Sequence, residues 1–271
     1  MNSSAHHTRS RLTTTGALRV PEITAAFWIV KGLSTAMGEA TSDYLVRVMA
    51  PPVAVILGFV AFLAALVVQF RTARYTAWTY WSAVVGVGVF GTMAADVLHV
   101  ALGVPYTASS ALYAILLFAV FALWRRTEKT LSIHSIDTPR REAFYWATVV
   151  ATFAMGTALG DFTAFTLNMG YFASLALFAV LIAVPAVGYR WLRWNPVLAF
   201  WTAYVITRPL GASIADGLGK EKSVGGLGLG DGTVALVLTL LIVGMVAYLS
   251  VTKADVQRAP TVEAEKVREN A

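Results

Sequence analysis

FWIVKGLSTAMGEATSD, which runs from Phe27 to Asp43, is apolar enough to enter a lipid bilayer, yet it contains a lysine, a glutamate and an aspartate. Three further segments repeat its pattern without insertions: YWSAVVGVGVFGTMAAD from Tyr80, YWATVVATFAMGTALGD from Tyr145 and FWTAYVITRPLGASIAD from Phe200. Each reads aromatic residue, tryptophan, nine residues, glycine, four residues, aspartate. A match of this kind at four places indicates an internally repeated fold.

The composition predicts that the chain lies in a membrane. Of its 271 residues, 57% are hydrophobic and only 13% are charged, whereas soluble domains are about 25% charged. Apolar runs of about 20 residues, enough to cross a bilayer as a helix, recur along its length. We therefore predict an all-α integral membrane protein with eight transmembrane helices. The predicted spans are residues 22–44, 46–70, 76–101, 106–124, 142–167, 170–190, 196–217 and 231–251.

The repeats also predict the domain organisation. Each unit is a motif helix followed by a returning helix, because YTASSALYA after Asp96 matches YFASLALFA after Asp161. All four units begin on the same side of the membrane, so they are parallel repeats related by an axis along the membrane normal. We expect a single membrane domain and two cytoplasmic tails. The domain covers residues 21–252, with repeats at about 21–70, 75–125, 141–190 and 195–252, and the tails cover 1–20 and 253–271.

Both termini are predicted to be cytoplasmic, because lysine and arginine gather in the segments on one side of the membrane. That side holds Arg9, Arg11, Arg19, Arg71, Arg74, Arg125, Arg126, Lys129, Arg140, Arg141, Arg190, Arg193, Lys253, Arg258, Lys266 and Arg268. The opposite loops hold only Arg47, Lys220 and Lys222. The net charge of +6 therefore reflects topology, and nucleic acid is not an expected partner. The first 20 residues lack an apolar core and are not expected to be a cleaved signal peptide.

Several kinds of chemistry are not expected. The absence of cysteine excludes disulfides, thiolate metal ligands and cysteine nucleophiles. The sequence has no nucleophile elbow, no HExxH motif and no persuasive Ser/His/Asp arrangement. We therefore predict no catalytic residue, no enzymatic activity and no covalently bound cofactor.

Each position of the repeated motif has a predicted role. The tryptophans should lie at the cytoplasmic interface of the membrane, and each glycine begins a small-xxx-small step that lets helices approach closely. The aspartates follow the tryptophans by 15 residues, about 22 Å along a helix, and should lie in the outer part of the bilayer. These residues are Trp28, Trp81, Trp146 and Trp201; Gly38, Gly91, Gly156 and Gly211; and Asp43, Asp96, Asp161 and Asp216.

The four aspartates are the candidate cation site. A carboxylate near a helix C-terminus opposes the helix macrodipole, and ionisable residues within spans usually face a bundle interior or a pathway. If the four motif helices pack through their glycine faces, the four carboxylates would meet at one depth and select cations. If the helices pack in pairs, two sites of two carboxylates would form. In the simplest alternative, each aspartate only ends its helix in water.

Individual copies add further ligands and charges. Glu39 lies one helical turn before Asp43 on the same face, and His99 follows Asp96 by one turn. Carboxylates with an imidazole and no thiolate suit Mg²⁺, Mn²⁺ or a proton better than soft ions.

Two basic residues lie inside the predicted spans. Lys31 and Arg208 are expected to act as counter-charges that pair with a carboxylate when the site is empty. Pro209, beside Arg208, should kink or break its helix, and a broken span often marks the binding region of a transporter.

The segments PEITAAFWIVKGLSTAMGEATSDYL, REAFYWATVVATFAMGTALGD and TRPLGASIADGLGK resemble a bacterial family of uncharacterised membrane-anchored proteins. The resemblance covers most of the chain from Pro21 to about Leu249. It implies a multipass protein of the bacterial inner membrane and carries no activity with it.

These observations predict a membrane transporter of a divalent metal cation, with membrane lipid and the small cation as partners. A compact chain without an ATPase or capture domain favours export, coupled to protons, over import. Two alternatives stay open: a non-transporting scaffold or lipid-interacting protein, and an intramembrane enzyme that uses paired carboxylates with His99 on a lipid substrate. The sequence leaves the oligomeric state open.

Overall fold

The computed structural model of the chain describes residues 17–257, and within that range it contains helices and no strands. Most of the two predicted tails, including Arg9, Arg11, Arg258, Lys266 and Arg268, lies outside the described residues.

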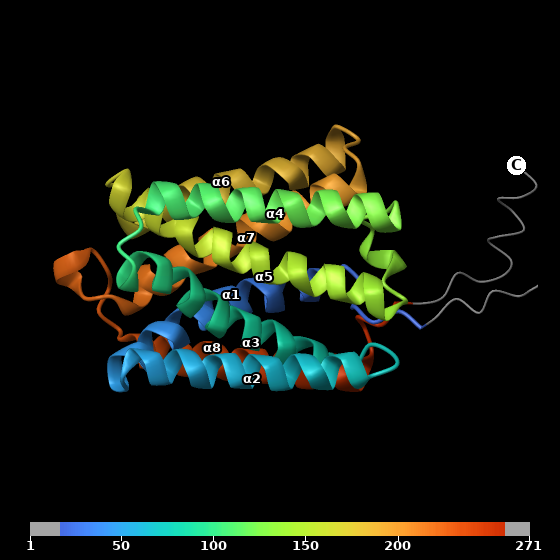
Figure 1. Cartoon of the computed structure of the whole chain (residues 1–271), viewed down its shortest axis with the longest axis horizontal. Helices are drawn as coiled ribbons and strands as arrows, with labels where there is room; N and C mark the ends of the chain where they lie inside the picture. Colours follow the sequence, from blue (N-terminus) through green and yellow to red (C-terminus); the bar gives the residue numbers. More distant parts are fainter. Residues whose placement is uncertain (1–16, 258–271) are drawn as a thin grey trace, which may run out of the picture.

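Eight α-helices run along the long axis of the molecule (Figure 1). They are α1 (Ala25–Val48), α2 (Pro51–Arg71), α3 (Ala77–Asp96), α4 (Tyr106–Glu128), α5 (Pro139–Asp161), α6 (Gly170–Trp191), α7 (Pro196–Gly219) and α8 (Asp231–Thr252). Short π-helices, η1 (Val97–Ala101) and η3 (Phe162–Thr166), continue α3 and α5, and two 3₁₀ turns lie in loops.

The predicted spans correspond to these eight helices, but several ends are shifted. α1 begins at Ala25 because Thr24 caps it by accepting a hydrogen bond from the backbone amide of Phe27, and α2 begins at Pro51, five residues later than expected. α7 continues as a helix through Pro209, so the expected break is absent. Neighbouring helices pack tightly on both sides of α7 and can hold a proline-containing helix together.

Seven of the eight helices in the described range are long and apolar enough to cross a membrane. The exception is α1, which carries Lys31, Glu39, Asp43 and Arg47. Large apolar side chains cover the outer faces of the even-numbered helices, whereas threonines and charged residues are buried inside. An apolar exterior around a polar interior is the arrangement expected of a multipass membrane protein.

The four motif helices α1, α3, α5 and α7 form a closed ring. Each packs against the next in the order α1, α3, α5, α7 and back to α1. The even-numbered helices lie outside this ring, with α4 and α6 on one side and α2 and α8 on the other in Figure 1. Of the two arrangements that the sequence left open, association of all four motif helices is present, and packing in separate pairs is not.

Each even-numbered helix packs mainly against the motif helix of the following repeat. α2 packs on α3, α4 on α5 and α6 on α7, and α8 closes the circle by packing on α1. These contacts are more extensive than those between the two helices of one repeat. The repeats are therefore linked in a ring in which every unit covers its neighbour.

The repeat glycines lie at the crossings between motif helices. A Cβ atom added to Gly38 would lie 2.7 Å from the backbone of Gly88 in α3, and one added to Gly211 would lie 2.1 Å from Oγ1 of Thr35 in α1. Both distances are below van der Waals contact, so only glycine fits without a shift of the neighbouring helix.

The other two glycines follow the same rule. A Cβ at Gly91 would lie 3.0 Å from Cβ of Phe153 in α5, and one at Gly156 would lie 2.4 Å from Cγ of Arg208 in α7. Each repeat glycine thus faces the next motif helix around the ring, and together they bring the four helices close to one axis.

The end of the bundle where the described chain begins and ends is closed by side chains. The residues that precede the repeat tryptophans, Phe27, Tyr80, Tyr145 and Phe200, are all buried there. The hydroxyls of Tyr80 and Tyr145 are hydrogen-bonded to each other, and the rings of Phe27 and Phe200 lie 6.0 Å apart. The backbone amide of Glu22 also donates to the carbonyl of Asp255, which ties the two chain ends together.

Candidate functional site

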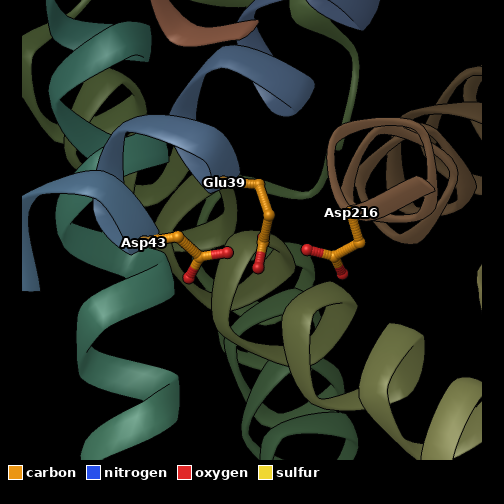
Figure 2. A group of neighbouring side chains, drawn as sticks. All are labelled: Glu39, Asp43 and Asp216. Atoms are coloured by element: carbon orange, nitrogen blue, oxygen red, sulfur yellow. The ribbon is translucent and has the colours of Figure 1, made fainter. Parts of the chain in front are cut away.

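Three carboxylates converge at the end of the ring opposite the described chain ends. Glu39 and Asp43 extend from α1, and Asp216 extends from α7 (Figure 2). One carboxylate oxygen of each residue lies within 4.8 Å of one carboxylate oxygen of each of the other two. In the described part of the chain, no other three Asp, Glu, His or Cys side chains bring their ligand atoms within this distance of one another. Glu39 lies between the two aspartates in Figure 2, so α1 and α7 together build this cluster.

Lys220 is the cation nearest to the outer part of the cluster. Its ammonium forms an ion pair with Asp43, lies 3.8 Å from Oδ1 of Asp216 and lies 4.0 Å from Oδ2 of Asp231. Burial alone would lower the pKa of Lys220, but the carboxylates of Asp43 and Asp216 outweigh this effect and raise the pKa above its ordinary value. Lys220 is therefore positively charged at physiological pH.

A second ion pair completes this end of the bundle. Nη2 of Arg47 lies 2.6 Å from Oδ2 of Asp231, whose side chain is buried. The site predicted from the sequence did not include Arg47, Lys220 or Asp231. The spacing of Lys220, four residues after Asp216 at the end of the same helix, was the only sequence signal for it.

Arg208 binds the inner carboxylate of the cluster. Its side chain is fully buried, and its Nη2 lies 2.6 Å from Oε2 of Glu39. The same nitrogen donates to Oγ1 of Thr157 at 2.6 Å and also contacts Oγ1 of Thr92. Arg208 thus pairs with a carboxylate in this structure, in the way expected of a counter-charge.

Lys31 has different neighbours from those expected. Its side chain is buried, and Nζ lies 4.1 Å from the ring centre of Phe153 and 4.2 Å from that of Tyr204. In the described part of the chain Nζ has neither a hydrogen bond nor an ion pair. The expectation that Lys31 pairs with a carboxylate is therefore wrong for this structure. Arg208 forms the ion pair with Glu39 instead, and the ammonium of Lys31 lies against the faces of two aromatic rings.

Asp96 and Asp161 lie at the corresponding positions of the second and third repeats, where α3 and α5 end. Both are outside the cluster of three carboxylates. In each case the helix continues directly as a π-helix, η1 after Asp96 and η3 after Asp161. Such π-helical turns are rare and are often found at functional sites.

His99 lies in η1 and is also outside the cluster. Its Nδ1 is 2.8 Å from the carbonyl oxygen of Val104, and its ring stacks on Tyr106 with ring centres 3.6 Å apart. These contacts hold the ring in the loop between α3 and α4, one turn beyond Asp96.

Three of the four repeat tryptophans lie inside the protein. Trp81, Trp146 and Trp201 are buried, and only Trp28 is half-buried. Nε1 of Trp201 donates to the carbonyl oxygen of Leu131 at 2.9 Å. The predicted interfacial position is therefore wrong for three of the four, because the ring of motif helices and the loops at this end enclose them.

A model of the family described as Repeat of Unknown Function (DUF347) matches residues 26–75, 79–130, 144–193 and 199–255, which together make up most of the chain. Each matched segment contains one motif helix and the helix that follows it. The four matches show that the chain contains four repeats. No curated protein and no solved structure matches the chain.

Proposed function

We propose that this chain, which belongs to the Repeat of Unknown Function (DUF347) family, is a transporter of a divalent metal cation in the bacterial inner membrane. The observation that carries the proposal is the closed ring of motif helices, with carboxylates converging at one end of a buried polar interior. Oxygen ligands of this kind suit hard divalent cations such as Mg²⁺ and Mn²⁺. The direction that we propose is export, in exchange for protons.

In the proposed topology all eight helices span the membrane and both termini are cytoplasmic. α1 supports this topology despite its polarity, because α3, α7 and α8 surround it and its Lys31 and Glu39 are buried in the protein. The carboxylate cluster then lies at the periplasmic end, and the layer of buried aromatic residues lies at the cytoplasmic end.

The proposed mechanism begins with electrostatic attraction. Asp43, Asp96, Asp161 and Asp216 attract a cation to the periplasmic end of the ring, where acidic side chains select for positive charge. The arriving cation competes with Lys220 for Asp43 and Asp216, since the ammonium already pairs with Asp43 and lies 3.8 Å from Oδ1 of Asp216. Glu39, held by Arg208, precedes these aspartates on the path of an exported ion. His99 stays a candidate ligand only if the loop after α3 rearranges.

Calorimetry on the detergent-purified protein tests the proposal. We expect saturable binding of at least one of Mg²⁺, Mn²⁺, Co²⁺ and Zn²⁺, and loss of that binding in the quadruple variant with Asn at Asp43, Asp96, Asp161 and Asp216. Asp137→Asn is the matched control, because this aspartate lies in the loop before α5 and pairs with Arg141. Single Asp→Asn changes in the four repeats should abolish flux into proteoliposomes while the protein stays folded; flux retained in all four would contradict the proposal.

A scaffold function has one specific observation in its favour. Glu39 and Asp43 are already paired with Arg208 and Lys220, and such pairs can simply hold helices together. A scaffold predicts that Asp→Asn changes lower the melting temperature and that neither the parent nor any variant binds or moves a cation.

The proposed orientation can be tested with single cysteines, because the natural chain has none. Ser223→Cys places a thiol in the exposed loop before α8, and His134→Cys places one in the exposed loop before α5. A membrane-impermeant maleimide added to intact spheroplasts should label the first variant and label the second only after permeabilisation. The cysteine-free parent is the blank, and the opposite labelling pattern would reverse the orientation.

A further inference from the structure

One point on the axis of the ring is surrounded by side-chain oxygens from three different repeats. Glu39, Thr92 and Thr157 each directly follow a repeat glycine, so they occupy the same position in successive copies. Their oxygens all contact one atom, Nη2 of Arg208. We call these three residues the inner oxygen layer. The fourth copy has Ala212 at this position and supplies Arg208 from the preceding turn of its helix.

The threonine hydroxyls are oriented as acceptors. Oγ1 of Thr92 can donate its hydrogen to the carbonyl oxygen of Gly88 at 2.9 Å or to Oε2 of Glu39 at 3.5 Å, and Oγ1 of Thr157 donates to the carbonyl oxygen of Phe153 at 3.1 Å. A hydroxyl has only one hydrogen to donate. Both hydroxyls therefore present only lone pairs to Arg208, as the carboxylate of Glu39 does.

This arrangement fits a compact cation better than it fits a guanidinium. Arginine has five N–H donors in a planar fork, and its preferred partners are bidentate acceptors. Here three oxygens gather around Nη2, which has two hydrogens, whereas Nε and Nη1 have no hydrogen-bond partner among the described residues. The acceptors are concentrated on Nη2, and the rest of the guanidinium has no hydrogen-bond partner among the described residues, although it lies over the ring of Phe153 with Cζ 5.3 Å from the ring centre.

We propose that the inner oxygen layer is a second cation-binding site and that Nη2 of Arg208 stands in it as a tethered substitute for the transported ion. The inference rests on the proposed function and specifies the path: an exported ion binds Glu39, Thr92 and Thr157 when Arg208 withdraws, and then passes to the outer carboxylates, Asp43 and Asp216. One carboxylate and two hydroxyls are hard oxygen ligands, so the site takes a hard cation. Arg208 is permanently charged, so the layer always holds a positive charge until an ion replaces it.

The test compares four purified proteins by calorimetry: the parent, Arg208→Ala, Arg208→Ala with Thr92→Val and Thr157→Val, and Arg208→Ala with Thr152→Val. The probes are methylguanidinium and Mn²⁺. Methylguanidinium should bind Arg208→Ala and not the parent, and Mn²⁺ should bind Arg208→Ala at least about tenfold more tightly than the parent. Both gains should disappear with the two inner-layer valines. They should persist with Thr152→Val, because this hydroxyl bonds only within α5.

The inference is overturned if Arg208→Ala binds neither probe better than the parent, or if the two inner-layer valines leave the gains unchanged. Since Arg208→Ala can lose the fold, Thr92→Val/Thr157→Val with Arg208 retained gives an independent readout. It should keep Mn²⁺ binding at the outer carboxylates and lose at least about tenfold in Mn²⁺ flux, and unchanged flux would refute the second site. If instead methylguanidinium binds as expected while the parent neither binds nor moves any cation, the inner layer stands and the proposed transport function fails.

Discussion

Arg208→Met is expected to lower the free energy of unfolding by about 3–5 kcal/mol, the typical cost of removing one partner of a buried ion pair. The substitution leaves the carboxylate of Glu39 buried beside Thr92 and Thr157 with no cation to neutralise it. Neutralising this carboxylate as well should restore much of the loss, so Glu39→Gln/Arg208→Met should be more stable than Arg208→Met alone. Unfolding in detergent, followed by circular dichroism, measures both differences.

The control for this prediction is Arg140→Met. Arg140 also pairs with a glutamate, Glu128, but its side chain is largely exposed and Arg141 binds the same carboxylate. Exposed pairs contribute about 0–1 kcal/mol, so the control should be nearly as stable as the parent. If Arg208→Met and Arg140→Met lowered the free energy of unfolding equally, burial of the Arg208–Glu39 ion pair would add nothing to stability.

Gly38→Ala should destabilise the ring by about 1–3 kcal/mol through overpacking. The new Cβ would lie 2.7 Å from the backbone of Gly88, and a backbone cannot move aside as a flexible side chain can. α1 and α3 would have to separate, and the outer carboxylates would shift with α1. A lower melting temperature together with weaker Mn²⁺ binding is the expected result.

Gly32→Ala is the matched control on the same helix. A Cβ at Gly32 has no atom within 4 Å, and alanine is better than glycine inside a helix by about 0.5–1 kcal/mol. This variant should therefore be at least as stable as the parent. If Gly38→Ala were equally well tolerated, the close crossing of α1 and α3 would be wrong.

The sequence indicated the ring as one of two possible arrangements, because its determinants are local and repeated. Four glycines at a fixed distance before four aspartates mark one face on each motif helix, and the structure brings these four faces together. The pairing of the even-numbered helices with the following repeat could not be predicted in this way. Their outer faces are uniformly apolar, so hydropathy does not indicate which motif helix they cover.

The sequence predicted which types of residue form the candidate site, but it predicted only some of the contacts between them. Glu39, Asp43 and Asp216 do converge, and Arg208 does pair with a carboxylate. The ion pair of Lys220 with Asp43 was missed because the two residues are 177 positions apart. Lys31 was misassigned because its distance from Glu39 along α1 says nothing about the aromatic rings that α5 and α7 place around it.

The circular packing of the repeats has a consequence for symmetry. Four identical copies of a two-helix unit, assembled as separate subunits, would have to place every side chain on the axis four times over. Four guanidiniums at the position of Arg208 would repel one another, and four copies of Glu39 would do the same. Joining the units in one chain allows a single arginine to face one glutamate and two threonines. The linked chain can therefore be nearly fourfold in its backbone and fully asymmetric in its chemistry.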